Sequence, residues 1–148
     1  MRANKKLNIV LDIGKTNIKL IFFDQNNKVV KSFNSKQRST KKHGIKVLNS
    51  PSVYEWTLQK IKTVEKKYQL NKFVCTAHAC STALIDFNDK ELIACTDYEF
   101  PYHKYVKGYQ KIIPSFNESY TPLLENGLNT GLQLYYLNQK QPGLIKKT

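Results

Sequence analysis

Six residues near the start of the chain have the types that phosphate chemistry requires. They are Asp12, Gly14, Lys15, Thr16 and Asn17, which lie between two apolar runs, and Lys19, which follows the first residue of the second run. An aspartate at a strand end can hold a magnesium ion directly or through water. The glycine permits a positive φ and a close approach of the backbone to a ligand, and the polar groups and N–H groups of such a turn can bind an anion. The stretch therefore predicts a site for a phosphate group and a magnesium ion.

Two apolar runs enclose this stretch and must position it. Ile9 to Leu11 has the length and β-branched content of a buried strand, and Ile18 to Phe23 is again β-branched and aromatic. A polar turn over residues 24–28 leads to a third strand, Val29 to Phe33, which we expect to pair antiparallel with the second. The chain therefore begins with three meandering strands, and the phosphate site lies in the turn between the first two.

A helix and a fourth strand follow. The polar, basic residues 34–49 are interpreted as a loop. Ser52 and Glu55 have the spacing of a capping box at a helix start, and Trp56 is expected to anchor this helix on the sheet. Phe73 to Thr76 is predicted to be a buried strand parallel to the first, with the helix as the crossover between them.

The second half of the chain is less regular. We predict a hairpin from Ser81–Phe87 and Leu92–Ala94, and a helix over Asn129–Gln139. Residues 96–121 are long, aromatic and without periodicity. A segment of this length without secondary structure is unusual unless it is functional or covered by another part of the protein.

The polar turn resembles a known phosphate motif. The pattern Asp12-x-Gly14-x-Thr16-Asn17-x-Lys19 resembles the first phosphate motif of the sugar kinase, Hsp70 and actin superfamily and, within it, of the FGGY carbohydrate kinases. Residues 76–86, which contain a His-Ala pair, resemble that family's strand, His-Gly and strand segment. Residues 122–137 resemble its Leu-Pro-x-Gly-Leu-Asn-x-Gly-x-Gln-Leu helix start. The three matches lie in the family's order and span Leu7 to Pro142.

This resemblance implies an α/β fold of the ribonuclease-H-like (actin-like ATPase) type. The mixed sheet would start with three antiparallel strands and would be incomplete in this chain. Residues 1–148 would correspond to the amino-terminal part of the first domain of an FGGY kinase, and the second domain, on the nucleotide side, is absent from them. The cofactors implied are ATP and Mg²⁺.

The resemblance also assigns roles to residues. The phosphate-binding residues would be Gly14, Lys15, Thr16, Asn17 and Lys19, with Asp12 as the metal ligand. His78 and Ala79 stand where the family has its sugar-binding His-Gly pair. The methyl group of Ala79 narrows the space that a glycine leaves, and a purely structural role for His78 stays open. Lys19 stands where many relatives have arginine, which keeps the charge but loses the guanidinium fork.

The implied activity is ATP-dependent phosphorylation of a sugar hydroxyl. Asp24, Asp86 and Asp89 occupy turn positions, and no aspartate here matches the family's catalytic base. The adenosine-binding glycines are also missing from these residues. We therefore assign no catalytic residue to this chain and expect it to be inactive by itself. It would be an amino-terminal kinase fragment, a split subunit that needs a separate carboxy-terminal half, or a non-catalytic remnant.

The charge suggests a further alternative, a basic nucleic-acid-binding module. The 148 residues carry a formal net charge of +13. Only Arg2 and Arg38 among the 24 basic residues are arginine, however, and base readout and phosphate clamps favour arginine. The composition therefore argues against nucleic acid. An acidic region elsewhere in a longer protein would balance this charge.

Cysteine usage and hydropathy indicate a cytoplasmic protein. The three cysteines, at positions 75, 80 and 95, form no Cys-x-x-Cys pair and predict free thiols in a reducing compartment. Cys75 lies in an apolar run and is expected in the core. We find no signal peptide and no apolar run long enough to cross a membrane. We therefore expect no membrane partner, and a hydrophobic fraction of 41% is enough for a folded core.

Overall fold

The computed structural model describes residues 5–42, 44–93, 95–124 and 126–148. They form two compact units. The first, which we call the sheet unit, contains residues up to Arg38 together with Asn49–Ala79. The second, the helical unit, contains Ser39–Leu48 and Cys80–Thr148. The chain therefore leaves the sheet unit for the short insertion 39–48 and returns to it before the second half begins.

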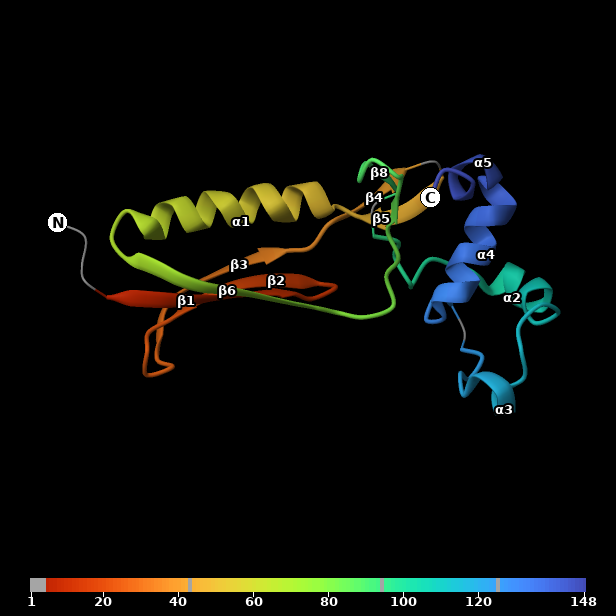
Figure 1. Cartoon of the computed structure of the whole chain (residues 1–148), viewed down its shortest axis with the longest axis horizontal. Helices are drawn as coiled ribbons and strands as arrows, with labels where there is room; N and C mark the ends of the chain where they lie inside the picture. The colour runs from red at the N-terminus through yellow and green to blue at the C-terminus, as the bar shows by residue number, and fades with distance from the viewer. Residues whose placement is uncertain (1–4, 43, 94, 125) are drawn as a thin grey trace. The chain divides into compact units, whose positions relative to one another are not determined.

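The sheet unit is one four-stranded mixed sheet with one helix (Figure 1). Its elements are β1 (Lys6–Ile13), β2 (Asn17–Phe23), β3 (Val29–Lys36), α1 (Ser50–Glu65) and β6 (Gln69–Ala77). The strand order is β3-β2-β1-β6. β1 pairs antiparallel with β2, β2 pairs antiparallel with β3, and β6 pairs parallel with β1. The three initial antiparallel strands and the parallel fourth strand predicted from the sequence are thus confirmed.

The core of the sheet unit forms on the face that α1 covers. Alternate residues of the first two strands are buried there, because successive side chains of a strand point to opposite faces. These residues are Leu7, Ile9, Leu11, Ile18, Leu20 and Phe22. Val53 and Val64 of α1 belong to the same cluster, and Trp56 packs against it. Trp56 therefore anchors the helix on the sheet, as predicted.

The start of α1 differs from the prediction. The helix begins at Ser50, and its N-cap is Asn49, whose Oδ1 accepts a hydrogen bond of 3.2 Å from the Ser52 backbone N–H. The expected capping box of Ser52 and Glu55 is therefore wrong. Asparagine is as good an N-cap as serine, and Pro51 in the first turn needs no hydrogen-bond partner for its nitrogen. The helix consequently begins three residues earlier than a cap at Ser52 would give.

Two further predictions are corrected in and beside the sheet unit. Phe73 to Thr76 lies in β6 and is exposed rather than buried. Cys75 is likewise exposed and not a core residue. The reason is that β6 is the last strand of the sheet in the described residues, so it is paired on one side only. The loop predicted over residues 34–49 contains the end of β3 and a two-stranded hairpin.

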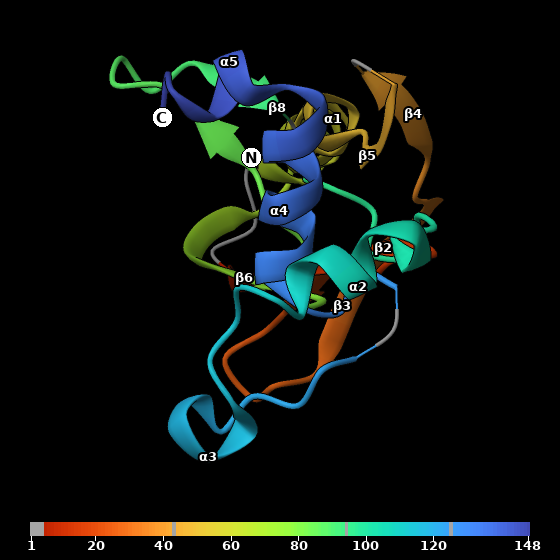
Figure 2. The same ribbon diagram turned by 90° about the vertical axis from the view of Figure 1, so that its right-hand side faces the viewer.

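In the described residues of the helical unit, two small hairpins are combined with four helices (Figure 2). The hairpins are β4 (Ser39–Lys42) with β5 (Ile45–Leu48), and β7 (Leu84–Ile85) with β8 (Glu91–Ile93). The helices are α2 (His103–Tyr109), α3 (Phe116–Ser119), α4 (Thr130–Lys140) and α5 (Pro142–Ile145). The predicted hairpin and the helix at 129–139 are confirmed, although the first strand of the hairpin is shorter than Ser81–Phe87. Ala94 lies outside the described residues.

The segment 96–121, expected to be irregular, is partly helical. Ser115 and Glu118 form a capping box, in which the Ser115 backbone N–H donates a 2.8 Å hydrogen bond to Glu118 Oε2. This box starts the single turn of α3. α2 packs against α4, and Tyr102, Tyr105 and Tyr136 pack edge to face. Tyr102 of this segment therefore belongs to the buried core of the unit, and Phe100, Tyr105 and Tyr109 pack against that core.

A buried glutamine ties the helical unit together. Gln133 of α4 donates hydrogen bonds from Nε2 to the carbonyl oxygens of Cys80, at 2.7 Å, and of Gly127. Its Oε1 accepts a hydrogen bond from the Thr96 hydroxyl. The Thr96 oxygen also accepts a 3.0 Å hydrogen bond from the Thr82 backbone N–H. One side chain therefore joins three chain segments, which explains a fully buried polar residue in α4.

Candidate functional site

Asp12 and Lys19 lie side by side at the carboxyl end of β1. They are direct partners in the antiparallel pairing of β1 with β2, so their side chains lie on the same face of the sheet. The same row continues to Asn34 on β3 and to Thr76 on β6. The row crosses all four strands, on the face opposite α1, and each of its four side chains is at least partly exposed. The sequence motif therefore belongs to a polar row that crosses the sheet near the carboxyl end of β1.

Asn34 and Thr76 were not predicted as site residues. Asn34 was interpreted as loop and Thr76 as part of a buried strand, so neither had a signal of its own. Only the strand register places them beside Asp12 and Lys19. Their distance in the chain from the turn explains why the local motif does not contain them.

The turn between β1 and β2 is tight, and the residue that follows β3 holds it from one side. A Cβ atom at Gly14 would lie 2.7 Å from the Asn17 carbonyl oxygen, so any larger residue would force the turn to open. The expected positive φ at Gly14 is absent, and the glycine is required by this close approach instead. The carbonyl oxygen of Thr16 accepts a 2.9 Å hydrogen bond from the Gln37 backbone N–H. Lys15 is half-buried, and Thr16, Asn17 and Lys19 are exposed.

His78 lies beside this turn. Its backbone N–H donates a 3.0 Å hydrogen bond to the carbonyl oxygen of Ile13, the last residue of β1. The imidazole Nδ1 lies 3.0 Å from the carbonyl oxygen of Ala79, so the ring donates there when this nitrogen carries the proton. Ala79 itself is exposed. The structure thus brings His78 and Ala79 next to Asp12 and the turn, at the carboxyl ends of two parallel strands where α/β sheets bind ligands.

The donor set of this site fits a hydrated magnesium ion better than a metal held by protein alone. In the part of the chain that the structure describes, no three His, Cys, Asp or Glu side chains gather as a metal site. Mg²⁺ is commonly held by one or two carboxylates, with water and phosphate oxygens completing its octahedron. Asp12, half-exposed at the strand end with the Thr76 hydroxyl in the same row, matches that pattern.

Two of the other aspartates have structural roles in similar turns, as predicted. Asp24 Oδ1 accepts 3.0 Å hydrogen bonds from the backbone N–H groups of Asn26 and Lys28, and Asp24 Oδ2 lies 3.0 Å from Lys5 Nζ. The hydrogen bond to Lys5 and those from the backbone hold the pKa of Asp24 below its ordinary value. Asp86 accepts the equivalent two backbone hydrogen bonds, from Asn88 and Lys90.

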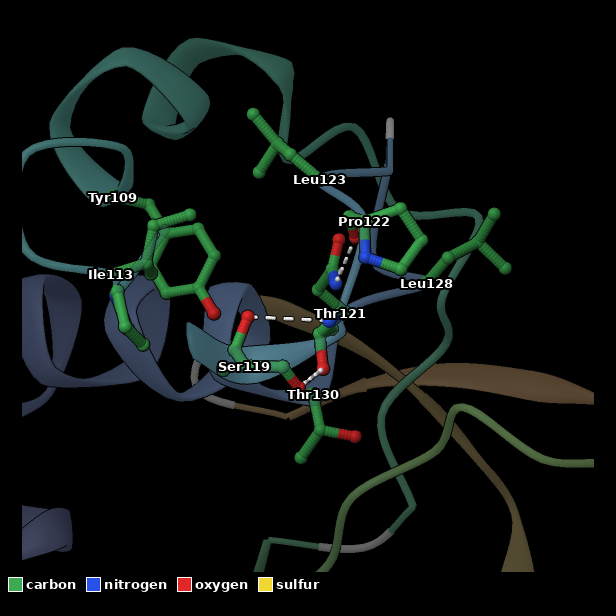
Figure 3. Close-up of a pocket in the computed structure, with 11 residues that line it drawn as sticks. Tyr109, Ile113, Ser119, Thr121, Pro122, Leu123, Leu128 and Thr130 are labelled. Carbon is green, nitrogen blue, oxygen red and sulfur yellow. Dashed lines mark hydrogen bonds between the residues drawn. The ribbon is translucent and has the colours of Figure 1, made fainter. Parts of the chain in front are cut away.

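The helical unit contains a separate cavity of about 480 Å³ (Figure 3). It is lined by the end of α2, the segment containing α3, and the first residues of α4. Figure 3 shows Tyr109 and Ile113 on one side and Pro122 and Leu128 on the other. The cavity contains none of the predicted site residues.

Comparison with known proteins gives no match at the level of sequence. No protein-family profile matches the chain, and no curated protein matches it. Solved structures do match. A carbohydrate kinase from Novosphingobium aromaticivorans superposes with a TM-score of 0.83 at 24% identity, over 98% of this chain and 31% of that one.

The fold is that of part of a carbohydrate kinase.

Other kinases of this kind agree. Gluconate kinase from Lactobacillus acidophilus superposes with a TM-score of 0.76 at 16% identity, over 98% of this chain and 30% of that one. Glycerol kinase from Plasmodium falciparum, solved with ADP, gives 0.72 at 18% identity, over 96% of this chain and 31% of that one. The chain thus spans about 31% of the length of the first kinase it matches. The predicted resemblance to carbohydrate kinases is confirmed at the level of the fold. No helix in the described residues is long and apolar enough to cross a membrane.

Proposed function

We propose that the chain is the amino-terminal part of an FGGY-family carbohydrate kinase, and that it holds the phosphates of ATP. Residues 1–148 would then form part of the first domain, with a ribonuclease-H-like core. The observation that carries the proposal is the juxtaposition of Asp12, the Gly14–Asn17 turn, Lys19 and His78 at the carboxyl ends of β1 and β6. The chain has this arrangement within a carbohydrate kinase fold.

Each part of the site has a role in this proposal. The backbone N–H groups of the turn, the Thr16 hydroxyl, the Asn17 amide and the lysines at positions 15 and 19 bind phosphate oxygens. Asp12 holds Mg²⁺, which neutralises charge on the phosphates when it is bound. With Nδ1 donating to the Ala79 carbonyl oxygen, His78 accepts a hydrogen bond from a sugar hydroxyl at Nε2, and Ala79 sets the width of the space beside it. These roles position the two substrates without moving a proton between them.

Transfer of the phosphoryl group needs more than this chain supplies. A base for the sugar hydroxyl and a pocket for adenosine are required, and Asp24 and Asp86 are already engaged in turns. We therefore propose that the isolated chain binds phosphates but does not transfer them. Turnover would require a carboxy-terminal half, either in a longer cytoplasmic product of the same locus or as a separate subunit. Without such a half the chain would be a non-catalytic remnant.

Calorimetry with two ligands tests the proposal. We expect Mg-ATP and Mg-tripolyphosphate to bind the isolated chain with similar dissociation constants, on the order of millimolar, because the site contacts phosphate and not adenosine. Lys19→Met removes a charge-assisted hydrogen bond, which is worth about 1.5–3 kcal/mol, and should weaken both ligands at least about tenfold. Lys66→Met is the matched control, since Lys66 caps the far end of α1. Absence of binding, or equal effects of the two substitutions, would refute the proposal.

A second assay addresses the reaction. ATP consumption with a panel of sugars should be absent for this chain and present for a longer product of the locus. A longer product that binds neither sugar nor nucleotide would show that the kinase assignment is wrong. The nucleic-acid alternative predicts a gel shift at low salt that weakens steeply as salt rises.

A further inference from the structure

We propose that the seam between β3 and α1 is a docking surface for an acidic segment of a partner polypeptide, bound in an extended conformation. The seam consists of two facing rows of side chains in the sheet unit, which are Lys31, Phe33 and Ser35 of β3 and Ser52, Trp56 and Lys60 of α1. It lies on the face that α1 covers, whereas the proposed phosphate site lies on the opposite face. The inference therefore goes beyond the proposed function and does not depend on it.

The strand register and the period of the helix create the two rows. The three β3 residues are the register partners of buried residues of β2, so their side chains point to the face that α1 covers. The three α1 residues are spaced by four, so they lie on one side of the helix. Within the described chain β3 is hydrogen-bonded only to β2 (Figure 1). An extended segment can therefore reach the seam from the outer edge of β3.

Two lysines approach the same aromatic ring at one end of the seam. Lys31 Nζ and Lys60 Nζ lie 5.4 and 5.7 Å from the centroid of the Phe33 ring, and Lys60 is half-buried. Among the described residues no carboxylate pairs with either ammonium group. Two ammonium groups that share one ring repel each other, although each is attracted to the ring itself. A carboxylate beside them would remove this repulsion.

The other end of the seam is a hollow of about 250 Å³. Its lining includes Lys36 and Arg38 next to Ser35, Ser52 and Trp56. None of the described lining residues is acidic, and neither basic side chain forms an ion pair with a described carboxylate. The seam therefore has positive charge at both ends, with an aromatic and hydroxyl-bearing stretch between them.

The two charged ends are too far apart for one small anion. Lys31 and Lys36 are five residues apart on β3, which corresponds to about 17 Å along a strand. An extended peptide of about six residues spans this distance. A segment with acidic residues toward both ends, and small or apolar residues between them, would match the seam.

Three features favour an acidic polypeptide over other occupants of a basic surface. Nucleobases stack on aromatic faces, but the Phe33 ring is already contacted by two lysines and by Phe22. Lysines on an edge strand discourage a neutral or basic strand and attract an acidic one. A second copy of this chain offers no acidic run, because none of its 11 acidic residues is adjacent to another in the sequence. The occupant is therefore a different polypeptide.

A nuclear magnetic resonance titration with a blocked hexaglutamate peptide tests the inference. Amide shifts in the folded chain should be confined to β3, to Arg38 and to the first three turns of α1. A hexaglutamine peptide of the same length, which lacks the charge, should cause no shifts. The affinity for hexaglutamate should fall at least about tenfold between about 50 and about 500 mM salt, because exposed charges are screened.

Variants locate the contact. Lys60→Met and Arg38→Met should each weaken hexaglutamate binding about two- to fivefold, which is the contribution of an exposed ion pair, and the double variant about tenfold. Lys62→Met is the matched control. It removes the same charge from the same helix, but Lys62 is exposed on a different side of α1, so the affinity should not change. Circular dichroism of each variant confirms that it is folded.

Several results would overturn the inference. They are the absence of binding at low salt, shifts spread over the whole chain, binding of hexaglutamine as tight as that of hexaglutamate, and equal effects of Lys60→Met and Lys62→Met. Tighter binding of a single-stranded oligothymidylate at the same residues would identify a nucleic-acid site instead. Equally tight binding of tripolyphosphate at the seam would show that a small anion is sufficient, which contradicts an extended segment as the occupant.

Discussion

Lys46 and Asp97 form an ion pair across the helical unit, with Nζ 2.8 Å from Oδ2. Lys46 is on β5, and Asp97 lies just after β8. The Asp97 side chain is 1% exposed, while the lysine reaches solvent. The Asp97 backbone N–H also donates a 3.0 Å hydrogen bond to the Lys46 carbonyl oxygen. The insertion 39–48 is therefore fastened to the second half of the chain by both backbone and side chain.

This pair predicts an asymmetric response to mutation. Lys46→Met leaves a buried carboxylate without its cation and should lower the free energy of unfolding by about 3 kcal/mol. Asp97→Asn should cost less, because the freed ammonium can turn into water. Urea unfolding of both variants and of the double variant measures the coupling. A larger loss for Asp97→Asn than for Lys46→Met would contradict this account.

Gly14→Ala should abolish phosphate binding by the isolated chain. The added methyl group would lie 2.7 Å from the Asn17 carbonyl oxygen, so the turn must open and its N–H groups must move. The free energy of unfolding should fall by about 1–3 kcal/mol, as in overpacked sites. Gly143→Ala is the matched control, because a methyl group there meets no atom within 4 Å. Calorimetry with Mg-tripolyphosphate that showed equal affinity for the two variants would exclude the turn as the phosphate site.

The cysteines should differ in their rates of alkylation. Cys75 on β6 is exposed, whereas burial raises the pKa of the Cys95 thiol and keeps it protonated. Since the thiolate is the reactive form, iodoacetamide should modify Cys75 at least about tenfold faster than Cys95 in the folded chain. Peptide mass spectrometry over time gives both rates. In denaturant the two rates should become similar, and equal rates in the native state would contradict the exposure of β6.

Asp24 should make stability sensitive to acid. Its pKa is lowered in the folded chain, first by the hydrogen bond with Lys5 and then by the backbone N–H groups. Because the pKa is lowered on folding, the ionised aspartate stabilises the fold fully at pH values above the pKa of an aspartate in the unfolded chain, about 3.9. This contribution disappears as the pH falls through the folded pKa. Asp24→Asn should therefore be less stable than the parent near neutral pH, with the difference shrinking in acid. A difference that stays constant with pH would argue against the ion pair.

The local patterns in the sequence were sufficient for most of the sheet unit. Short apolar runs rich in β-branched and aromatic residues predict β1 and β2, and a polar turn before the next such run predicts β3. The apolar stripe of α1 predicts its packing on the sheet, because such a pattern reflects burial against a near neighbour. The β4–β5 hairpin was missed. Its strands have four residues each, and lysines interrupt the alternation, so only the burial of Ile45 and Val47 reveals it.

The sequence by itself determined the chemistry of the site. Asp12, Gly14, Thr16 and Lys19 are close in the chain, so their residue types and spacing indicate phosphate and metal binding without knowledge of the tertiary structure. The tertiary structure alone decided what surrounds them. Asn34 and Thr76 join the row through strand register, and His78 reaches it through a hydrogen bond to Ile13. The exposure of β6 was also beyond the sequence, because burial of a strand depends on whether another segment pairs with its edge and covers its faces.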